Sequence, residues 1–177
     1  MTDTETQAVD PELAALGELY ARHSPDVGRR GSAEALVAAA RSHRALAARR
    51  AAGMAIVRVA GDSAQPEAVV EVVTDDMPFL VDSVLGAIER AGGSSAGILH
   101  PIVVVRRDGA GTLLETLPDA DPVDPPAGAI AESWLRVELV AAVPDPAALR
   151  AEVEAVLRDV REVIADGSAM VHRAVEL

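Results

Sequence analysis

The sequence predicts an α+β fold, in which an antiparallel sheet with two helices on one face follows an N-terminal α-helical hairpin. Apolar residues recur at helical spacing to about residue 52 and then take the two-residue period of strands. From residue 68 the expected order is β-α-β-β-α, a ferredoxin-like arrangement without its last strand. An apolar segment at 54–60 precedes residue 68 by a short polar turn. It can therefore fill the missing edge position and give a permuted four- or five-stranded sheet.

The helical hairpin is expected over residues 10–52. Asp10 is a suitable N-cap and Pro11 fits the first helical position, where its missing N–H has no partner to lose. Ser32 can cap a second helix over about 33–52, with small and apolar residues along one face. The sequence does not indicate where this hairpin packs.

The sheet domain is expected over residues 53–166, between a disordered tail at 1–9 and a C-terminal tail or linker at 167–177. A helix begins near residue 78 and ends at the glycine pair after residue 91. Asp145 caps the last helix, which has the strongest amphipathic pattern in the chain. The expected strands lie at 54–60, 68–75, 97–108, 112–117 and 132–140.

The composition excludes several kinds of chemistry. The chain has no Cys, and all of its 16 basic residues are Arg, so thiolate metal sites, Schiff-base lysines and a Walker P-loop are excluded. The formal net charge of −12 argues against a nucleic-acid partner. No apolar run approaches the ~20 residues that cross a bilayer, and the N-terminus is polar and acidic. We therefore expect a cytoplasmic protein with no membrane partner.

The candidate ligand site is the strand-to-helix junction formed by Asp75, Asp76, Met77, Pro78 and Phe79. One interpretation is purely structural: Asp76 is the N-cap and Pro78 lies in the first helical turn. The other is a pocket, because free N–H groups at a helix start attract a carboxylate while Asp75 or Asp76 attracts an ammonium group. An amino acid carries both charges.

Two further expectations concern this region and the remaining polar residues. We expect the strand at 54–60 to pair antiparallel with the strand at 68–75, and the ring of Phe79 to be buried between helix and sheet. The four histidines are too scattered along the chain to predict a metal site. We name no catalytic residue.

Three blocks of sequence, "EVVTDDMPFLVDSV", "HPIVVVRRD" and "ESWLRVEL", resemble the N-terminal segment of the large bacterial NAD-specific glutamate dehydrogenases over roughly residues 68–165. This resemblance implies that residues 53–166 form an ACT-like domain, a ferredoxin-like regulatory module of amino-acid metabolism. Ligand-binding ACT domains usually carry Gly after the Pro of the first strand-helix junction. Here Phe79 follows Pro78, which favours packing over ligand binding at this position.

The resemblance further implies a non-catalytic regulatory or assembly domain of a longer oxidoreductase. That parent enzyme converts glutamate, NAD⁺ and water to 2-oxoglutarate, ammonia and NADH, so NAD belongs to the parent and no cofactor to this segment. The implied partners are the remainder of the parent chain, other subunits of a homo-oligomer and an amino-acid effector. The alternative is a purely structural oligomerisation module without a small-molecule ligand.

Overall fold

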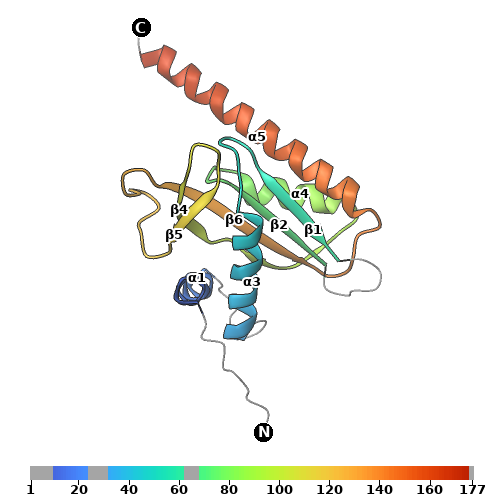
Figure 1. The fold of residues 1–177 in the computed structure, drawn as a ribbon. Coiled ribbons are helices and arrows are strands. Elements are labelled where there is room, and N and C mark those ends of the chain that lie inside the picture. Colours follow the sequence, from blue (N-terminus) through green and yellow to red (C-terminus); the bar gives the residue numbers. More distant parts are fainter. Residues whose placement is uncertain (1–9, 24–31, 62–67, 176–177) are drawn as a thin grey trace.

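The computed structural model describes residues 10–23, 32–61 and 68–175, with side chains to residue 165. The fold has three layers: one antiparallel sheet lies between two pairs of helices (Figure 1). The α+β fold expected from the sequence is confirmed. The disordered tail expected at 1–9 lies outside the described residues.

The sheet has the order β1-β2-β6-β4-β5, and β3 also pairs with β6. β3 and β4 lie end to end along β6. The strand is interrupted at Pro101 because proline has no N–H to donate to the ladder. The single strand expected at 97–108 is therefore two strands. The bounds are β1 Ile56–Ala60, β2 Ala68–Asp75, β3 Ser95–Leu99, β4 Ile102–Arg107, β5 Leu113–Leu117 and β6 Ile130–Leu139.

The pairing of the first two strands confirms the permuted order, but the sheet has six strands and not the four or five expected, because the strand expected at 97–108 is divided in two. β1 runs antiparallel to β2, from Ile56 opposite Val73 to Ala60 opposite Val69. β1 thus takes the edge position left by the missing last strand of the ferredoxin-like order. β2 is buried along nearly its whole length, as its apolar sequence predicts for a strand with neighbours on both sides.

Helices α4 (Leu80–Arg90) and α5 (Pro146–Val175) cover one face of the sheet, as expected. α5 continues past residue 166, where we expected a tail or linker, and its far end extends away from the sheet (Figure 1). The core on this face consists of Val57, Ala68, Val70, Val72, Leu80, Val84, Ala87, Ile88, Leu135, Val137, Leu139, Val143, Leu149, Val153 and Leu157.

Helices α1 (Pro11–Arg22) and α3 (Ala33–Leu46) cover the opposite face. α3 ends earlier than the expected residue 52, because the chain after it pairs with the turn between β4 and β5. There the Arg50 N–H donates to the Gly111 carbonyl at 2.8 Å. The second core consists of Leu16, Leu19, Tyr20, Leu36, Ala39, Ala40, Ala47, Val73, Leu99, Val103, Val105 and Trp134.

A buried histidine lies within this second core. His43 Nδ1 is 2.6 Å from the Tyr20 hydroxyl, and its Nε2 is 3.2 Å from the Leu135 carbonyl oxygen. The carbonyl can only accept, so Nε2 carries the proton and Nδ1 accepts from the hydroxyl. Burial is the main cause that lowers the pKa of His43 to about 4. The imidazole is therefore neutral in the folded chain.

We expect this histidine to make folding pH-dependent. Its unfolded pKa is about 6.5, so its contribution is complete above that pH and is lost as pH falls toward the folded value of about 4. Lowering the pH from about 7.5 to about 5 should cost roughly 2 kcal/mol of unfolding free energy. Urea unfolding at both pH values measures this loss. His43→Gln should show a clearly shallower pH dependence, and an equal slope in both proteins would contradict the assignment.

Candidate functional site

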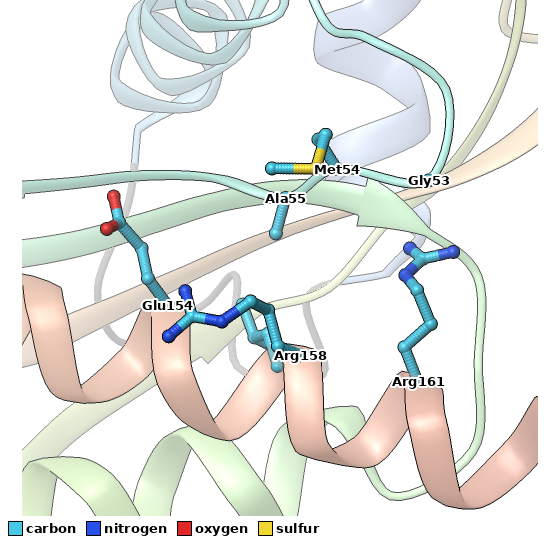
Figure 2. A pocket seen from close by; sticks show the side chains of 7 residues that line it. Gly53, Met54, Ala55, Glu154, Arg158 and Arg161 are labelled. Atoms are coloured by element: carbon cyan, nitrogen blue, oxygen red, sulfur yellow. The ribbon is translucent and has the colours of Figure 1, made fainter.

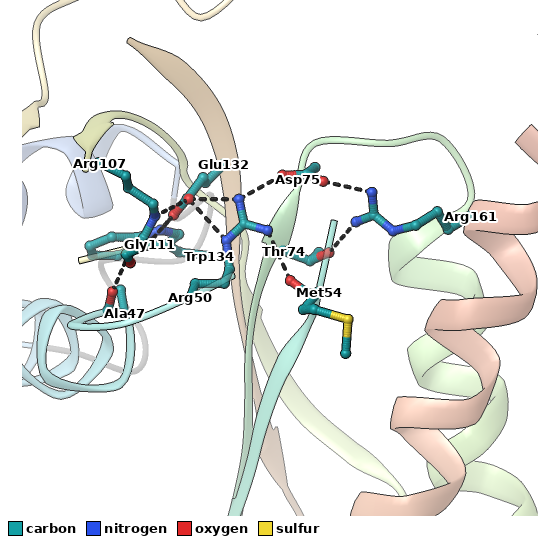
Figure 3. A network of polar contacts seen from close by, with 10 residues as sticks. All are labelled: Ala47, Arg50, Met54, Thr74, Asp75, Arg107, Gly111, Glu132, Trp134 and Arg161. Carbon is teal, nitrogen blue, oxygen red and sulfur yellow. Dashed lines mark hydrogen bonds and ion pairs between the residues drawn. The ribbon is translucent and has the colours of Figure 1, made fainter. Parts of the chain in front are cut away.

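A network of buried charges lies where the three layers meet, and its centre is Glu132 on β6 (Figure 3). The Glu132 carboxylate accepts from Arg50 Nε and Nη2 at 3.0 and 2.8 Å and from Arg107 Nε and Nη2 at 2.6 and 2.9 Å. The indole Nε1 of Trp134 adds a bond of 3.1 Å. The side chains of Arg50 and Glu132 are 0% exposed. This carboxylate therefore has its charge and its acceptor sites matched by buried donors.

Asp75 extends the network from Arg50 to helix α5. Its Oδ1 accepts from Arg50 Nη2 at 2.6 Å, and its Oδ2 accepts from Arg161 Nη1 at 2.6 Å. Arg161 also donates to the hydroxyl of Thr74 at 3.3 Å. Figure 3 shows Asp75 between the two guanidinium groups. The segment after α3, the sheet and α5 are thus joined through one carboxylate.

The ionisation of these carboxylates follows from their partners. Burial alone raises the pKa of Glu132, but the hydrogen bonds from Arg107 and the charge of Arg50 outweigh it and lower the pKa overall. The pKa of Asp75 is lowered in the same way, against the effect of burial, by Arg161 and Arg50. Both carboxylates are therefore charged at neutral pH, and their contributions to stability are lost as the pH falls through the acid range.

A second buried carboxylate lies on the same face of the sheet. Glu71 on β2 accepts from Arg58 on β1 and from Arg136 on β6, the latter at 2.7 Å. Arg58 also donates to Ser42 of α3. Glu71 stands directly opposite both arginines in the strand register. This cluster ties α3 to the sheet as the first network ties α5 to it.

The predicted site residues take different roles. Asp75 is a network member, and Met77 is partly buried against the core under α4. The assignments of Asp76 as N-cap and of Pro78 to the first helical turn are wrong: the helix begins at Leu80, its N-cap is Phe79, and no side chain caps it. Asp76 instead accepts from Ser133 Oγ at 2.7 Å, because it lies too many residues before the first turn to reach the free N–H groups.

Phe79 differs most from its expected place. The residue is 68% exposed, and its backbone has a φ of 64°, in the left-handed region. The expectation that it is buried between helix and sheet is wrong. The left-handed conformation turns the chain into α4, so that the core position is taken by Leu80, which is 2% exposed. Such a conformation costs about 1–2 kcal/mol for a residue with a side chain.

One cavity lies apart from the predicted junction (Figure 2). It measures about 170 Å³ and opens between α5 and the residues that precede β1. Phe79 and its neighbours do not line it. Its lining residues are Gly53, Met54, Ala55, Glu154, Leu157, Arg158 and Arg161.

Sequence reasoning missed Arg50, Arg107 and Glu132. The sequence predicts a helix over about 33–52 that includes Arg50 and a strand over 97–108 that includes Arg107. One signal was available: Glu132 begins an alternating apolar strand that also carries Trp134, whose indole N–H needs an acceptor when buried. Its arginine partners are 82 and 25 residues away along the chain, too far for any local pattern to indicate.

Comparison with known proteins decides the family. The family model described as "Glutamate dehydrogenase, ACT1 domain" matches residues 16–156. This chain belongs to the glutamate dehydrogenase ACT1 domain family. An NAD-specific glutamate dehydrogenase of Mycobacterium tuberculosis is similar to this ACT1 domain, with 37% identity over 142 residues. The match covers 77% of the chain and 8% of that relative. No solved structure matches the chain significantly.

The family match covers the sheet, α4, most of α1, α3 and the first part of α5. It therefore includes both buried carboxylates and the junction at 75–79, whereas the far end of α5 lies beyond it. Among the residues described for this ACT1 domain, no helix is long and apolar enough to cross a membrane. Within that same part of the chain, no three His, Asp or Glu side chains gather in a way that would hold a metal ion.

Proposed function

We propose that this ACT1 domain is a non-catalytic regulatory and assembly domain of an NAD-dependent glutamate dehydrogenase. Its family membership and its similarity to an NAD-specific glutamate dehydrogenase support this assignment. The parent oxidises glutamate to 2-oxoglutarate and ammonia, and NAD binds elsewhere in the longer chain. The domain's partners are the remainder of that chain and the other subunits of a homo-oligomer, in the cytoplasm.

The main support for a non-catalytic role is that the buried carboxylates are paired with arginines of the same domain. Glu132 and Glu71 each have two arginine partners and are buried, and neither lines the cavity beside α5. Groups that act on a substrate need access to it and a pKa near the working pH. These carboxylates have lowered pKa values and complete sets of partners, so they suit a rigid scaffold.

An amino-acid effector at the junction 75–79 remains part of the proposal in a restricted form. Asp75 is held by two arginines, so an ammonium group at Asp75 would have to displace one of them, whereas Asp76 is exposed and accepts from Ser133 through Oδ1. The alternative, a structural oligomerisation module without such a ligand, is favoured by Phe79. An exposed aromatic ring on a strained backbone suits a contact with another protein surface.

Removing residues 1–177 from the parent enzyme tests the assembly role. We expect the shortened enzyme to contain fewer subunits per particle, as its mass from sedimentation equilibrium would show, because the surface that joins its subunits is lost. Adding the separate 177-residue chain should restore the larger species, which distinguishes lost assembly from a misfolded remainder. An unchanged number of subunits and an unchanged response to metabolites would show that the domain has neither role.

A further inference from the structure

The cavity beside α5 has the size of a small-metabolite site. Its volume of about 170 Å³ holds roughly five or six water molecules at about 30 Å³ each. Pockets for drug-sized ligands begin at about 300 Å³, so a nucleotide is too large for it. A compact organic molecule of a few carbons fits this space.

Two arginines give the cavity a positive side. Arg158 and Arg161 lie three residues apart on α5 and so project from the same face of the helix (Figure 2). Arg158 is exposed, and within the described part of the chain it forms no ion pair. Glu154 is the acidic member of the lining, and its Oε1 accepts from Arg150 Nε at 2.8 Å. Arg158 is therefore available to an anion.

The second arginine is shared with the charge network. Arg161 donates through Nη1 to Asp75 and through Nη2 to Thr74, and its side chain is 33% exposed. A guanidinium group has five N–H donors, so the bonds to Asp75 and Thr74 do not use all of the donors of this cavity-lining residue. The remaining wall is apolar and includes the buried side chain of Leu157 and the methyl group of Ala55. The two guanidinium groups can each bind a carboxylate, and the apolar wall can contact a short carbon chain between them. The lining therefore complements an aliphatic dicarboxylate.

We propose that this cavity binds a small aliphatic dicarboxylate, with one carboxylate on Arg158 and the other on Arg161 in competition with Asp75. The ligand would thereby weaken the link between the sheet and α5, the helix that extends away from the domain. This site is distinct from the junction at 75–79. The inference goes beyond the assembly role and does not depend on it.

Calorimetric titration of the 177-residue chain at low salt tests the proposal, with glutarate, 2-oxoglutarate and L-glutamate as probes and acetate as the single-carboxylate comparison. We expect dicarboxylate binding at least about tenfold tighter than acetate binding, because a second charged contact is made. Arg158→Gln should weaken dicarboxylate binding at least about tenfold. The matched control is Arg41→Gln, which replaces an exposed arginine on α3 and should bind like wild type.

A second variant tests the competition for Arg161. Asp75→Asn removes the competing charge, so dicarboxylate binding should become several-fold tighter, the opposite of the Arg158→Gln effect. Absence of heat with every dicarboxylate, or equal affinity in wild type and Arg158→Gln, would overturn the site. Unchanged affinity in a folded Asp75→Asn chain would overturn the competition. Because the titration uses this chain alone, its failure leaves the assembly result in the parent enzyme unaffected.

Discussion

Replacing Glu132 by Gln should cost about 3–5 kcal/mol of unfolding free energy. The substitution keeps the size of the side chain but removes the negative charge between Arg50 and Arg107. Arg50 is fully buried and Arg107 is 6% exposed, so neither cation can regain water without opening the fold. A domain of ordinary size has only about 5–15 kcal/mol in total, so a large part of its stability depends on this carboxylate. Urea unfolding monitored by circular dichroism gives the value.

Glu115→Gln is the matched control. Glu115 pairs with Arg106 at 2.8 Å, but the two side chains are 50% and 39% exposed, so water screens their attraction. We expect a loss of no more than about 1 kcal/mol from this variant. Equal and small losses from both substitutions would mean that the buried network contributes little, contrary to its burial and geometry.

Gly111→Ala should destabilise the chain by about 3–5 kcal/mol, because two unfavourable terms act together. Gly111 has a φ of +82°, a conformation that strains any residue with a side chain. An added Cβ would also lie 2.7 Å from the carbonyl carbon of Arg50, which is backbone and cannot rotate away. The clash would separate the β4–β5 turn from the segment that positions Arg50. Thermal or urea unfolding measures the loss.

Gly128→Ala separates the two terms. Gly128 has a similar φ of +76°, yet an added Cβ meets no atom within 4 Å. This variant should lose only the strain, about 1–2 kcal/mol. If Gly128→Ala costs as much as Gly111→Ala, the close approach to Arg50 has no energetic effect and the packing argument fails.

Much of the fold was predictable because it depends on local patterns. The two-residue period of 54–60 and its short connection to 68–75 predicted a hairpin, and this hairpin fixed the permuted sheet. The apolar stripe of the last helix predicted its packing on the sheet. Pro101 could also have predicted the interruption between β3 and β4, since proline cannot donate within a ladder. The continuous apolar residues on both sides of it favoured a single strand instead.

The charge network was not predictable, because its members meet only in the folded chain. Asp75 and Glu132 stand opposite each other on paired strands, and this register became known only from the structure. Arg50 reaches them because α3 ends at Leu46 and the chain crosses to Gly111, a contact without a local signature. Phe79 was misplaced for a related reason: sequence periodicity does not reveal a left-handed backbone at a residue other than glycine.

Sedimentation of the parent enzyme carrying Phe79→Gly tests the assembly role most directly. Glycine removes the exposed ring and also relieves the strained φ, so this domain should fold at least as well as before. We predict that subunit association weakens at least about tenfold, since exposed aromatic anchors often carry much of an interface's energy. Leu114→Ala, at a residue 63% exposed on β5, is the control and should associate normally. Full association of the Phe79→Gly enzyme would contradict an assembly role for this surface.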